Sequence, residues 1–340
     1  AGWDGETGQE FARFAERIGL PVAGAFRRQD AIPNSSPAWA GNLGYGPNPK
    51  LVQRIREADL LLVVGARLGE ATTDGYALIT PDHPGQTLVH VHPDPNELNR
   101  VYLADLPICA RPFEFAATLA ADEEIELPRF DAEAAHAEWR EWSTPAPRDG
   151  VALDLGQCVA AMRAAMPADT IICNGAGNFS SWWHRYWPYG PQPSQLAPTA
   201  GAMGYGVPAA VAAALRFPER AVVALAGDGD FLMNGQELAT AVQHGADLIV
   251  LLVDNAAYGT IRMHQEREYP ARLSGTTLRN PDFAALARAY GGWAETVETT
   301  AQFAPALDRA LARSGLRLLH LKTDIEFIPP GLTVSGLRRK

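Results

Sequence analysis

The chain lacks most of the features that mark specialised classes of protein. Its 340 residues include three cysteines, far apart and without a CxxC spacing: Cys109, Cys158 and Cys173. This scarcity excludes a disulfide framework and a zinc knuckle, and it favours three buried thiols. There is no run of about 18 apolar residues, and no charged segment followed by an apolar one at the N-terminus. We therefore expect no membrane span and no signal peptide, and a cytoplasmic location.

Basic side chains are also scarce. Lys and Arg number 29 against 39 Asp and Glu, a formal net charge of −10, and the one basic cluster comprises the last three residues. We therefore do not expect a surface that binds nucleic acid phosphates. Apolar residues make up 47% and charged residues 20% of the chain, as in ordinary globular proteins. A length of 340 residues predicts two domains or one large one.

Helix-like and strand-like stretches alternate in two regions, residues 1–121 and 153–330. Residues 122–152 lose the alternation, carry charge and Pro, and are interpreted as a linker with one short helix; residues 331–340 form a tail. Such alternation predicts an α/β fold with two open, mainly parallel sheets and helices on both faces, that is, three-layer α/β/α domains. Within the first region, the Gly-, Pro- and Asn-rich residues 34–49 are expected to form a loop.

Two loops in the second region directly follow strand-like runs. The sequence GDGD (227–230) follows AVVALA and precedes a helix, and DNAAYG (254–259) follows LIVLLV. Glycine lets the backbone approach a phosphate, a helix start supplies free N–H groups, and a carboxylate beside a phosphate requires a cation between them. Loops that follow parallel strands meet at one edge of the sheet, where ligands bind. We therefore predict a phosphate group held with magnesium by oxygens of Asp228 and Asn255.

Residues 227–255, GDGDFLMNGQELATAVQHGADLIVLLVDN, resemble the signature of thiamine-diphosphate-dependent enzymes, which is GDG, a spacer, and then Asn-Asn or Asp-Asn. The flanking segments GAMGYGVPAAVAAALRFPER and YGTIRMHQEREYP are similar to those of the acetolactate synthase and 2-oxoacid decarboxylase branch. The resemblance extends over the whole chain, since residues 1–121 are similar to the middle domain and 153–330 to the diphosphate-binding domain. It implies an enzyme that uses thiamine diphosphate and Mg²⁺.

The resemblance also implies a role for individual residues. Magnesium would be bound by the side chains of Asp228 and Asn255 and by the backbone carbonyl of Ala257. Met203 would wedge beneath the thiazolium ring, and the Gly201 carbonyl would accept a hydrogen bond from the aminopyrimidine; these are the implied catalytic positions. The other residues implied to hold the cofactor, several through N–H groups to the diphosphate, are Gly177, Asn178, Phe179, Gly227, Gly229, Asp230, Tyr258 and Gly259.

His264 stands where acetolactate synthases carry a Trp that shapes the pocket for the second substrate. A histidine has an unperturbed pKa of about 6.5, which suits proton transfer. The alternative is a surface histidine or a pocket wall. Gln265 and Glu266 are secondary candidates, with solvated helix positions as the alternative interpretation.

Enzymes of this branch have an N-terminal domain that binds the aminopyrimidine and supplies a glutamate. No segment of residues 1–340 resembles that domain, and the chain begins where the middle domain would have completed its first strand. We therefore expect the C-terminal two-thirds of an enzyme, either a truncated or proteolysed fragment or one polypeptide of a split enzyme, inactive by itself. The resemblance further implies a homo-oligomer, because the family assembles its site between two subunits.

The middle domain offers an incomplete match to a flavin site. Arg67 matches an Arg that holds FAD in acetolactate synthases, but His92 replaces a carboxylate, so FAD binding is doubtful. His90 and His92 form an H-x-H pair that is suited to zinc, yet no third ligand is near in sequence, which favours a structural pair. An aromatic cluster favours core or interface packing over a substrate cage; its members are Trp182, Trp183, Tyr186 and Trp187.

The function expected from the resemblance is decarboxylation of a 2-oxo acid followed by carboligation. One alternative is a decarboxylase or C–C lyase that acts on an aromatic or branched substrate, and another is a non-catalytic cofactor-binding subunit of a split enzyme. A nicotinamide dehydrogenase built on glycines 201, 204 and 206 is disfavoured, because these follow a Pro-rich loop and the dinucleotide fingerprint requires a strand.

Overall fold

The computed structural model of the chain describes residues 2–82, 84–121 and 129–338. Two units are formed, an N-terminal one of residues Ala1–Ser143 and Tyr189–Pro193 and a C-terminal one of Thr144–Pro188 and Ser194–Lys340. The chain thus returns briefly to the N-terminal unit, where the N–H of Tyr189 donates to the side chain of Asn34 at 2.9 Å.

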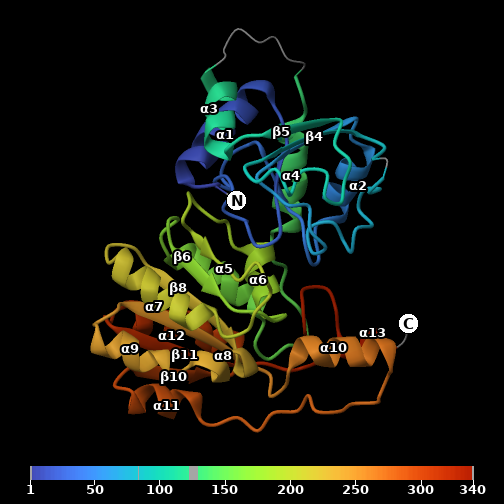
Figure 1. The fold of residues 1–340 in the computed structure, drawn as a ribbon. Coiled ribbons are helices and arrows are strands. Elements are labelled where there is room, and N and C mark those ends of the chain that lie inside the picture. The colour runs from blue at the N-terminus through green and yellow to red at the C-terminus, as the bar shows by residue number, and fades with distance from the viewer. Residues whose placement is uncertain (1, 83, 122–128, 339–340) are drawn as a thin grey trace. The chain divides into compact units, whose positions relative to one another are not determined.

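The C-terminal unit is built on a wholly parallel sheet. Its strands are β6 (Ile171–Asn174), β7 (Gln195–Leu196), β8 (Val222–Gly227), β9 (Leu248–Asp254), β10 (Trp293–Val297) and β11 (Leu316–Lys322) (Figure 1). They lie in the order β10-β11-β9-β8-β6-β7, and each adjacent pair is parallel. After β6 the chain moves to β7 on one side and then to β8 on the other. The loops after β6 and β8 therefore diverge at a switch point, the usual ligand-binding position of such sheets.

Helices cover this sheet and connect its strands. They are α5 (Leu155–Ala165), α6 (Ser180–Tyr186), α7 (Gly206–Arg216), α8 (Asp228–Asn234), α9 (Glu237–Gln243), α10 (Gly259–Glu268), α11 (Phe283–Ala289), α12 (Thr300–Leu311) and α13 (Val334–Leu337). Every residue of β8 and β9 is buried, which requires cover on both faces of the sheet. The expected α/β class with parallel strands is confirmed.

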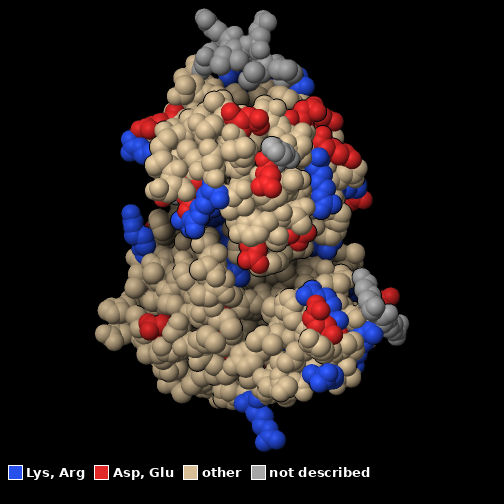
Figure 2. Space-filling model, turned by 45° about the vertical axis from the view of Figure 1, so that its right-hand side comes forward, with Lys and Arg blue, Asp and Glu red and all other residues tan. Residues whose placement is uncertain are grey.

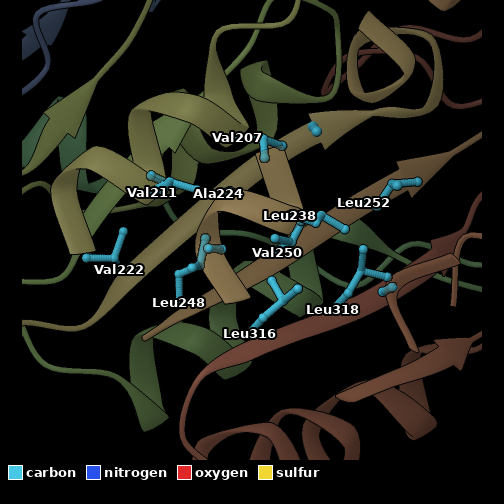
Figure 3. Packing of buried hydrophobic residues seen from close by; sticks show 14 of the residues in the cluster. Val207, Val211, Val222, Ala224, Leu238, Leu248, Val250, Leu252, Leu316 and Leu318 are labelled. Atoms are coloured by element: carbon cyan, nitrogen blue, oxygen red, sulfur yellow. The ribbon is translucent and has the colours of Figure 1, made fainter. Parts of the chain in front are cut away.

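The core of the C-terminal unit follows from strand alternation. Figure 3 shows Val207 and Val211 of α7 and Leu238 of α9 against alternate residues of β8, β9 and β11. Those strand residues are Val222, Ala224, Leu248, Val250, Leu252, Leu316 and Leu318. Because successive side chains of a strand point to opposite faces, the residues between them face the other layer, where α12 packs on β10, β11 and α5. This packing fixes the strand ends that carry the candidate site.

The N-terminal unit contains two small parallel sheets, β1-β2 and β3-β4-β5. Its elements are α1 (Gly5–Ile18), β1 (Val22–Gly24), β2 (Trp39–Asn42), α2 (Pro49–Glu57), β3 (Leu60–Val64), β4 (Thr87–His92), β5 (Leu106–Cys109), α3 (Pro112–Ala121) and α4 (Ala132–Trp142). Helix α1 packs against α3, and apolar residues of α1 pack with those of β1 and β2.

Two expectations are wrong in this unit, and one is confirmed. Strand β2 lies within residues 34–49, which were expected to form a loop; its pairing with β1 and a fully buried Trp39 outweigh the local Gly and Pro content. The short helix expected between residues 122 and 152 is present as α4 and packs on β2, while residues 122–128 lie outside the described residues. Cys109 is exposed because β5 is an edge strand, whereas Cys158 and Cys173 are buried.

Charged side chains are interspersed on the visible surface of the N-terminal unit, and acidic and basic residues alternate there (Figure 2). Much of the visible face of the C-terminal unit carries neither. Such interspersion is typical of a solvated surface. Of the helices in the described parts of the chain, none has both the length and the apolar character that a membrane span requires.

Candidate cofactor site

Oxygen atoms from the two strand-end loops converge on one backbone N–H. Gly227 ends β8 opposite Val253 of β9, so Asp228, the first residue of α8, and Asn255, the first residue after β9, lie side by side. The N–H of Ala257 donates to Asp228 Oδ2 at 3.2 Å and to Asn255 Oδ1 at 3.1 Å. The sequence prediction that these two side chains share one edge of the sheet is therefore correct in its geometry.

The backbone of the second loop turns sharply to place Ala257. Ala256 has a φ of 55°, in the left-handed region that residues other than glycine rarely occupy. The Asp254 carboxylate accepts from the Ala256 N–H at 2.9 Å and holds this turn. Ala257 then forms an antiparallel bridge with Thr277, and the two hydrogen bonds of that bridge do not use the Ala257 carbonyl. A carboxylate, an amide oxygen and a backbone carbonyl are hard ligands, so these residues fit Mg²⁺.

A hydrogen-bond network lies behind the two loops. The amide nitrogen of Asn280 donates to Asp228 Oδ2 and to Asp254 Oδ1, at 2.7 Å each. Asp254 Oδ2 contacts His320 Nε2 at 2.8 Å and accepts from Lys322 Nζ at 3.0 Å. Asn280 thus links the two carboxylates, and two groups of β11 anchor the second.

The carboxyl groups of Asp228 and Asp254 have pKa values shifted in opposite directions. Burial raises the pKa of Asp228 to about 6, against the hydrogen bonds that it accepts. Burial acts in the same direction on Asp254, but hydrogen bonds from His320 and Lys322 outweigh it and hold the pKa of this group well below its ordinary value. A cation beside Asp228 would favour its ionised form, so the chemistry of this position also suits a metal.

The loop after β6 packs against the GDGD loop. The ring of Phe179 fills the space beside Gly177 and Gly227, where an added Cβ would lie 2.7 and 2.8 Å from ring carbons. The N–H of Asn178 donates to Thr260 Oγ1 at 3.1 Å. The structure therefore brings the predicted residues of this loop to the same edge as Asp228.

Two further glycines serve close approach. The ring of Tyr258 lies against Gly229 and leaves no room for a side chain there. At Gly259, an added Cβ would lie 2.9 Å from the amide nitrogen of Asn255. These contacts explain why residues 229 and 259 are glycines.

The segment 201–204 lies against α8, the helix that begins with Asp228. Gly201 and Gly204 have φ values of 78° and 79°, which favour glycine, and Met203 between them is half-buried. The Gly204 carbonyl accepts from Asn234 at 2.9 Å, and its N–H donates to Asp230 Oδ1 at 2.8 Å. The loop with the two implied catalytic positions is therefore bonded to α8.

The residues predicted on α10 lie in a different setting. His264 is exposed, and its Nδ1 accepts from Arg267 at 2.8 Å, so the structure gives it a surface partner. Gln265 donates to the backbone beside α10, at Ser274. Glu266 is fully buried and accepts from Arg338 at 2.7 Å, so the interpretation of Glu266 as solvated is wrong.

Sequence reasoning missed the polar groups behind the loops. Asn280 lies in a segment without helix or strand, and only the fold brings it close to Asp228 and Asp254. His320 and Lys322, however, alternate at the carboxyl end of the apolar strand β11, directly beside β9. Polar residues at the end of a buried parallel strand are the signal that could have identified these two.

In the N-terminal unit, the candidate flavin residues Arg67 and His92 each have a partner close by in the same unit. Arg67 Nε lies 3.6 Å from Glu97 Oε1, which also accepts from Arg100 at 2.9 Å. His92 is buried, and its Nδ1 accepts from the Asp94 N–H at 3.1 Å. An imidazole held in this way does not supply the carboxylate that the resemblance implies for a flavin site.

The remaining candidates have structural partners. His90 Nε2 lies 2.9 Å from the Ala66 carbonyl, and no group of three or more His, Cys, Asp or Glu in the described residues could hold a metal. The aromatic cluster, Trp182, Trp183, Tyr186 and Trp187, is buried. Trp182 donates to the Ile328 carbonyl at 2.9 Å, as expected for packing within the unit.

Comparison with known proteins identifies two domains. Residues 2–119 match "Thiamine pyrophosphate enzyme, central domain", and residues 175–321 match "Thiamine pyrophosphate enzyme, C-terminal TPP binding domain". The chain is 29% identical to the acetolactate synthase isozyme 2 large subunit of Escherichia coli (strain K12), over 94% of this chain and 59% of the relative. It is 33% identical to the acetolactate synthase large subunit of Parasynechococcus marenigrum (strain WH8102), over 82% of this chain and 45% of the relative.

A solved structure shows the same fold. It is the thiamine diphosphate-dependent 4-hydroxybenzoylformate decarboxylase of Rhodococcus jostii RHA1, with a TM-score of 0.75 and 26% identity, covering 93% of this chain and 58% of that one. The chain therefore spans less than two thirds of the relatives that it matches. Both domain matches and these relatives confirm the predicted resemblance: the chain belongs to the thiamine-pyrophosphate-dependent enzymes, with their central domain and their C-terminal cofactor-binding domain.

Proposed function

We propose that the chain is part of a thiamine-diphosphate- and Mg²⁺-dependent enzyme that acts on a 2-oxo acid in the manner of an acetolactate synthase, by decarboxylation followed by carboligation. The observation that carries the proposal is the convergence of Asp228 and Asn255 oxygens on the Ala257 N–H. It lies beside the switch point of the sheet, where ligands of such folds bind.

The residues of the site have separate tasks in this proposal. Asp228, Asn255 and the Ala257 carbonyl bind the cation, and N–H groups of residues 177–179, 229 and 230 bind the diphosphate. For this, the N–H groups of Asn178 and Gly229 exchange their present acceptors, Thr260 Oγ1 and Asp228 Oδ1, for phosphate oxygens. Met203 and the Gly201 carbonyl orient the two rings of the cofactor. When bound, thiamine diphosphate supplies a nucleophilic carbon and an electron sink for decarboxylation. The protein contributes orientation and the surrounding electrostatics.

Binding tests the cofactor assignment. We expect calorimetric titration of the 340-residue chain with thiamine diphosphate to give saturable binding in the presence of Mg²⁺. Binding after EDTA treatment should be at least about tenfold weaker, because the contacts of the cation with Asp228 and with the diphosphate are lost. Affinity that is the same with Mg²⁺ and with EDTA would contradict the role of the cation.

A second candidate function is decarboxylation or C–C cleavage of an aromatic or branched substrate. It is favoured by the likeness to a 4-hydroxybenzoylformate decarboxylase. Product analysis of the complete enzyme distinguishes the two: an acetolactate synthase converts pyruvate to a coupled product, whereas the alternative releases an aldehyde from benzoylformate. The preference for coupling rests on the acetolactate synthase large subunits among the relatives.

We further propose that a pyrimidine-binding domain completes the site from outside residues 1–340, on the same polypeptide or on a second subunit of a homo-oligomer. The two domain matches are to the central and C-terminal domains. A non-catalytic cofactor-binding subunit is the alternative, and the reading frame upstream of Ala1 decides: a pyrimidine-binding domain encoded in it would contradict the split arrangement.

A further inference from the structure

Asp230 is a buried carboxylate that the proposed function uses only through its backbone. It lies in the first turn of α8, two residues after Asp228, and is 3% exposed. Its Oδ1 accepts from the Ala176 N–H at 3.1 Å and from the Gly204 N–H at 2.8 Å. One oxygen atom therefore bonds two segments that are distant in sequence, the loop after β6 and the loop before α7.

The packing around this carboxylate leaves little freedom. Gly175 lies directly against the Asp230 carboxylate, and an added Cβ at Gly175 would overlap its oxygens. On the other side, the Gly204 carbonyl accepts from Asn234, at the end of the same helix. Gly204 is thus held through its N–H by the first turn of α8 and through its carbonyl by the last.

The direction of the Asp230 side chain also has an electrostatic reason. A carboxylate turned toward the proposed diphosphate would repel it, whereas a buried carboxylate that accepts two N–H bonds has its charge neutralised in part by those donors. The N-terminal end of a helix further favours a negative charge in its first turn. The side chain can therefore brace the loops while its own N–H remains on the cofactor side of the helix.

We propose that Asp230 is a positioning residue that sets the relative placement of the three segments of the cofactor site, an inference that rests on the proposed function. The N–H of Gly204 belongs to the peptide bond that follows Met203, so the Asp230 bond fixes the backbone that carries Met203. Ala176 directly precedes Gly177, so the second bond fixes the start of the segment 177–179. Asp230 itself extends from the helix that begins with Asp228.

Asp154 provides a matched control in the same unit. It is also 3% exposed and also accepts from two backbone N–H groups, those of Gly156 at 2.9 Å and Arg148 at 3.1 Å. These partners lie outside the three cofactor segments, Gly156 in the first turn of α5 and Arg148 before that helix, and the Arg148 guanidinium also donates to Asp154 at 2.9 Å. Loss of either carboxylate removes a buried charged acceptor and is expected to lower stability. Only loss of Asp230 is expected to change the cofactor site.

The first arm of the test measures hydrogen exchange of individual amides in the chain without cofactor. In Asp230→Ala we expect the amides of Ala176 and Gly204 to exchange at least about tenfold faster than in the wild type, because they lose their acceptor. Asp230→Asn keeps an acceptor oxygen and should give a smaller change. Unchanged exchange in Asp230→Ala at both amides would overturn the proposal.

The second arm measures calorimetric affinity for thiamine diphosphate at saturating Mg²⁺. We expect Asp230→Ala to weaken it by about ten- to a hundredfold. Asp230→Asn keeps an acceptor oxygen and should recover part of the loss, but not all of it, since hydrogen bonds to a charged group are the stronger kind. Asp154→Ala should bind as the wild type does, even with a lower melting temperature. If Asp230→Ala does not fold, Asp230→Ser, too short to reach both amides, takes its place.

The possible outcomes distinguish failure of the positioning role of Asp230 from failure of the proposed function. Equal affinity of wild type and Asp230→Ala would overturn the positioning role and leave the proposed function intact. An equal loss of affinity in Asp154→Ala would also overturn it, because the effect would then be one of general stability. Absence of binding by the folded wild type would refute the proposed function, and the inference with it.

Discussion

At the scale of single residues, Asp228 and Asp254 lie at the ends of adjacent strands but behave differently. Burial brings the pKa of Asp228 to about 6, while His320 and Lys322 keep that of Asp254 low. A permanently charged Asp254 beside Asp228 would repel it if no donor lay between them. Asn280 is that donor, because its amide nitrogen serves both carboxylates. The amide thereby holds Asp228 in the place from which it is proposed to bind the cation.

Removal of this amide should therefore be costly. We expect Asn280→Ala to lower the free energy of unfolding by about 1–3 kcal/mol, because two carboxylates lose a buried donor. Urea unfolding in the absence of Mg²⁺ measures the effect. Asn96→Ala, at an exposed turn, is the control and should stay within about 0.5 kcal/mol of the wild type. An equally small change in Asn280→Ala would show that the hydrogen bonds of Asn280 do not contribute to the free energy of unfolding.

The residues of the site were predictable to different degrees. Asp228 and Asn255 each follow an apolar strand directly, so local sequence and the topology of parallel sheets place them together. Asn280 and Asp230 could not be assigned in this way. The partners of Asn280 are brought to it only by the fold, and the sequence does not show that the Asp230 side chain turns inward, away from the predicted phosphate position.

At the scale of elements, the contact between α7 and the sheet depends on Gly206. An added Cβ would lie 2.7 Å from the Gly175 nitrogen and 2.7 Å from the Leu225 carbonyl oxygen, both of which are backbone atoms. Backbone of a buried sheet cannot move aside as a flexible side chain can. The first residue of α7 must therefore be a glycine for the helix to lie this close to β6 and β8.

We accordingly expect Gly206→Ala to destabilise the C-terminal unit by about 1–3 kcal/mol through overpacking. Gly69→Ala is the matched control, because an added Cβ there meets no atom within 4 Å and the φ of Gly69 is not positive. Its stability should be unchanged or slightly higher. Chemical denaturation followed by tryptophan fluorescence measures both, and equal stabilities of the two variants would contradict the close contact.

A second element contact joins α10 to Arg338, the residue that follows α13, through an ion pair in which Glu266 is fully buried and the Arg338 side chain is 41% exposed. Hydrogen bonds from Arg338, against the effect of burial, lower the pKa of Glu266 to about 2. A carboxyl whose folded pKa lies below its unfolded value of about 4.3 stabilises the fold above that value, and the contribution is lost as the pH falls toward the folded pKa.

Glu266→Gln should therefore lower the melting temperature at pH 7 by about 2–4 °C. The difference from the wild type should narrow as the pH falls from about 5 to about 2, where the wild type loses its own ion pair. Scanning calorimetry across this range measures it. Glu268→Gln, in an exposed pair with Arg267, should match the wild type throughout. A difference for Glu266→Gln that is independent of pH would contradict the assignment.

Elements were predictable where their own sequence determines them. The strands β8 and β9 are continuous apolar runs, and both were expected. Strand β2 was not, because four residues around Trp39 in a Gly- and Pro-rich segment gain their structure from pairing with β1. Local propensity is a weak guide where tertiary pairing decides.

At the scale of the whole molecule, the chain spans 59% and 45% of two acetolactate synthase large subunits. If a pyrimidine-binding domain completes the site, the 340-residue chain should bind the cofactor but should not convert a 2-oxo acid. We expect no release of CO₂ from pyruvate by the purified chain with thiamine diphosphate and Mg²⁺, and activity once the missing domain is supplied. Turnover by the chain alone would contradict this division of the site.

In the proposed site, Asp228 binds the cation that holds the diphosphate. This role of Asp228 is tested most directly by titrating Mg²⁺ into the chain at a fixed concentration of thiamine diphosphate, for wild type, Asp228→Ala and Asp154→Ala. We expect Asp228→Ala to need at least about tenfold more Mg²⁺ than the other two for half-maximal binding, since it loses a charged ligand. The same Mg²⁺ dependence in all three proteins would show that Asp228 does not bind the cation.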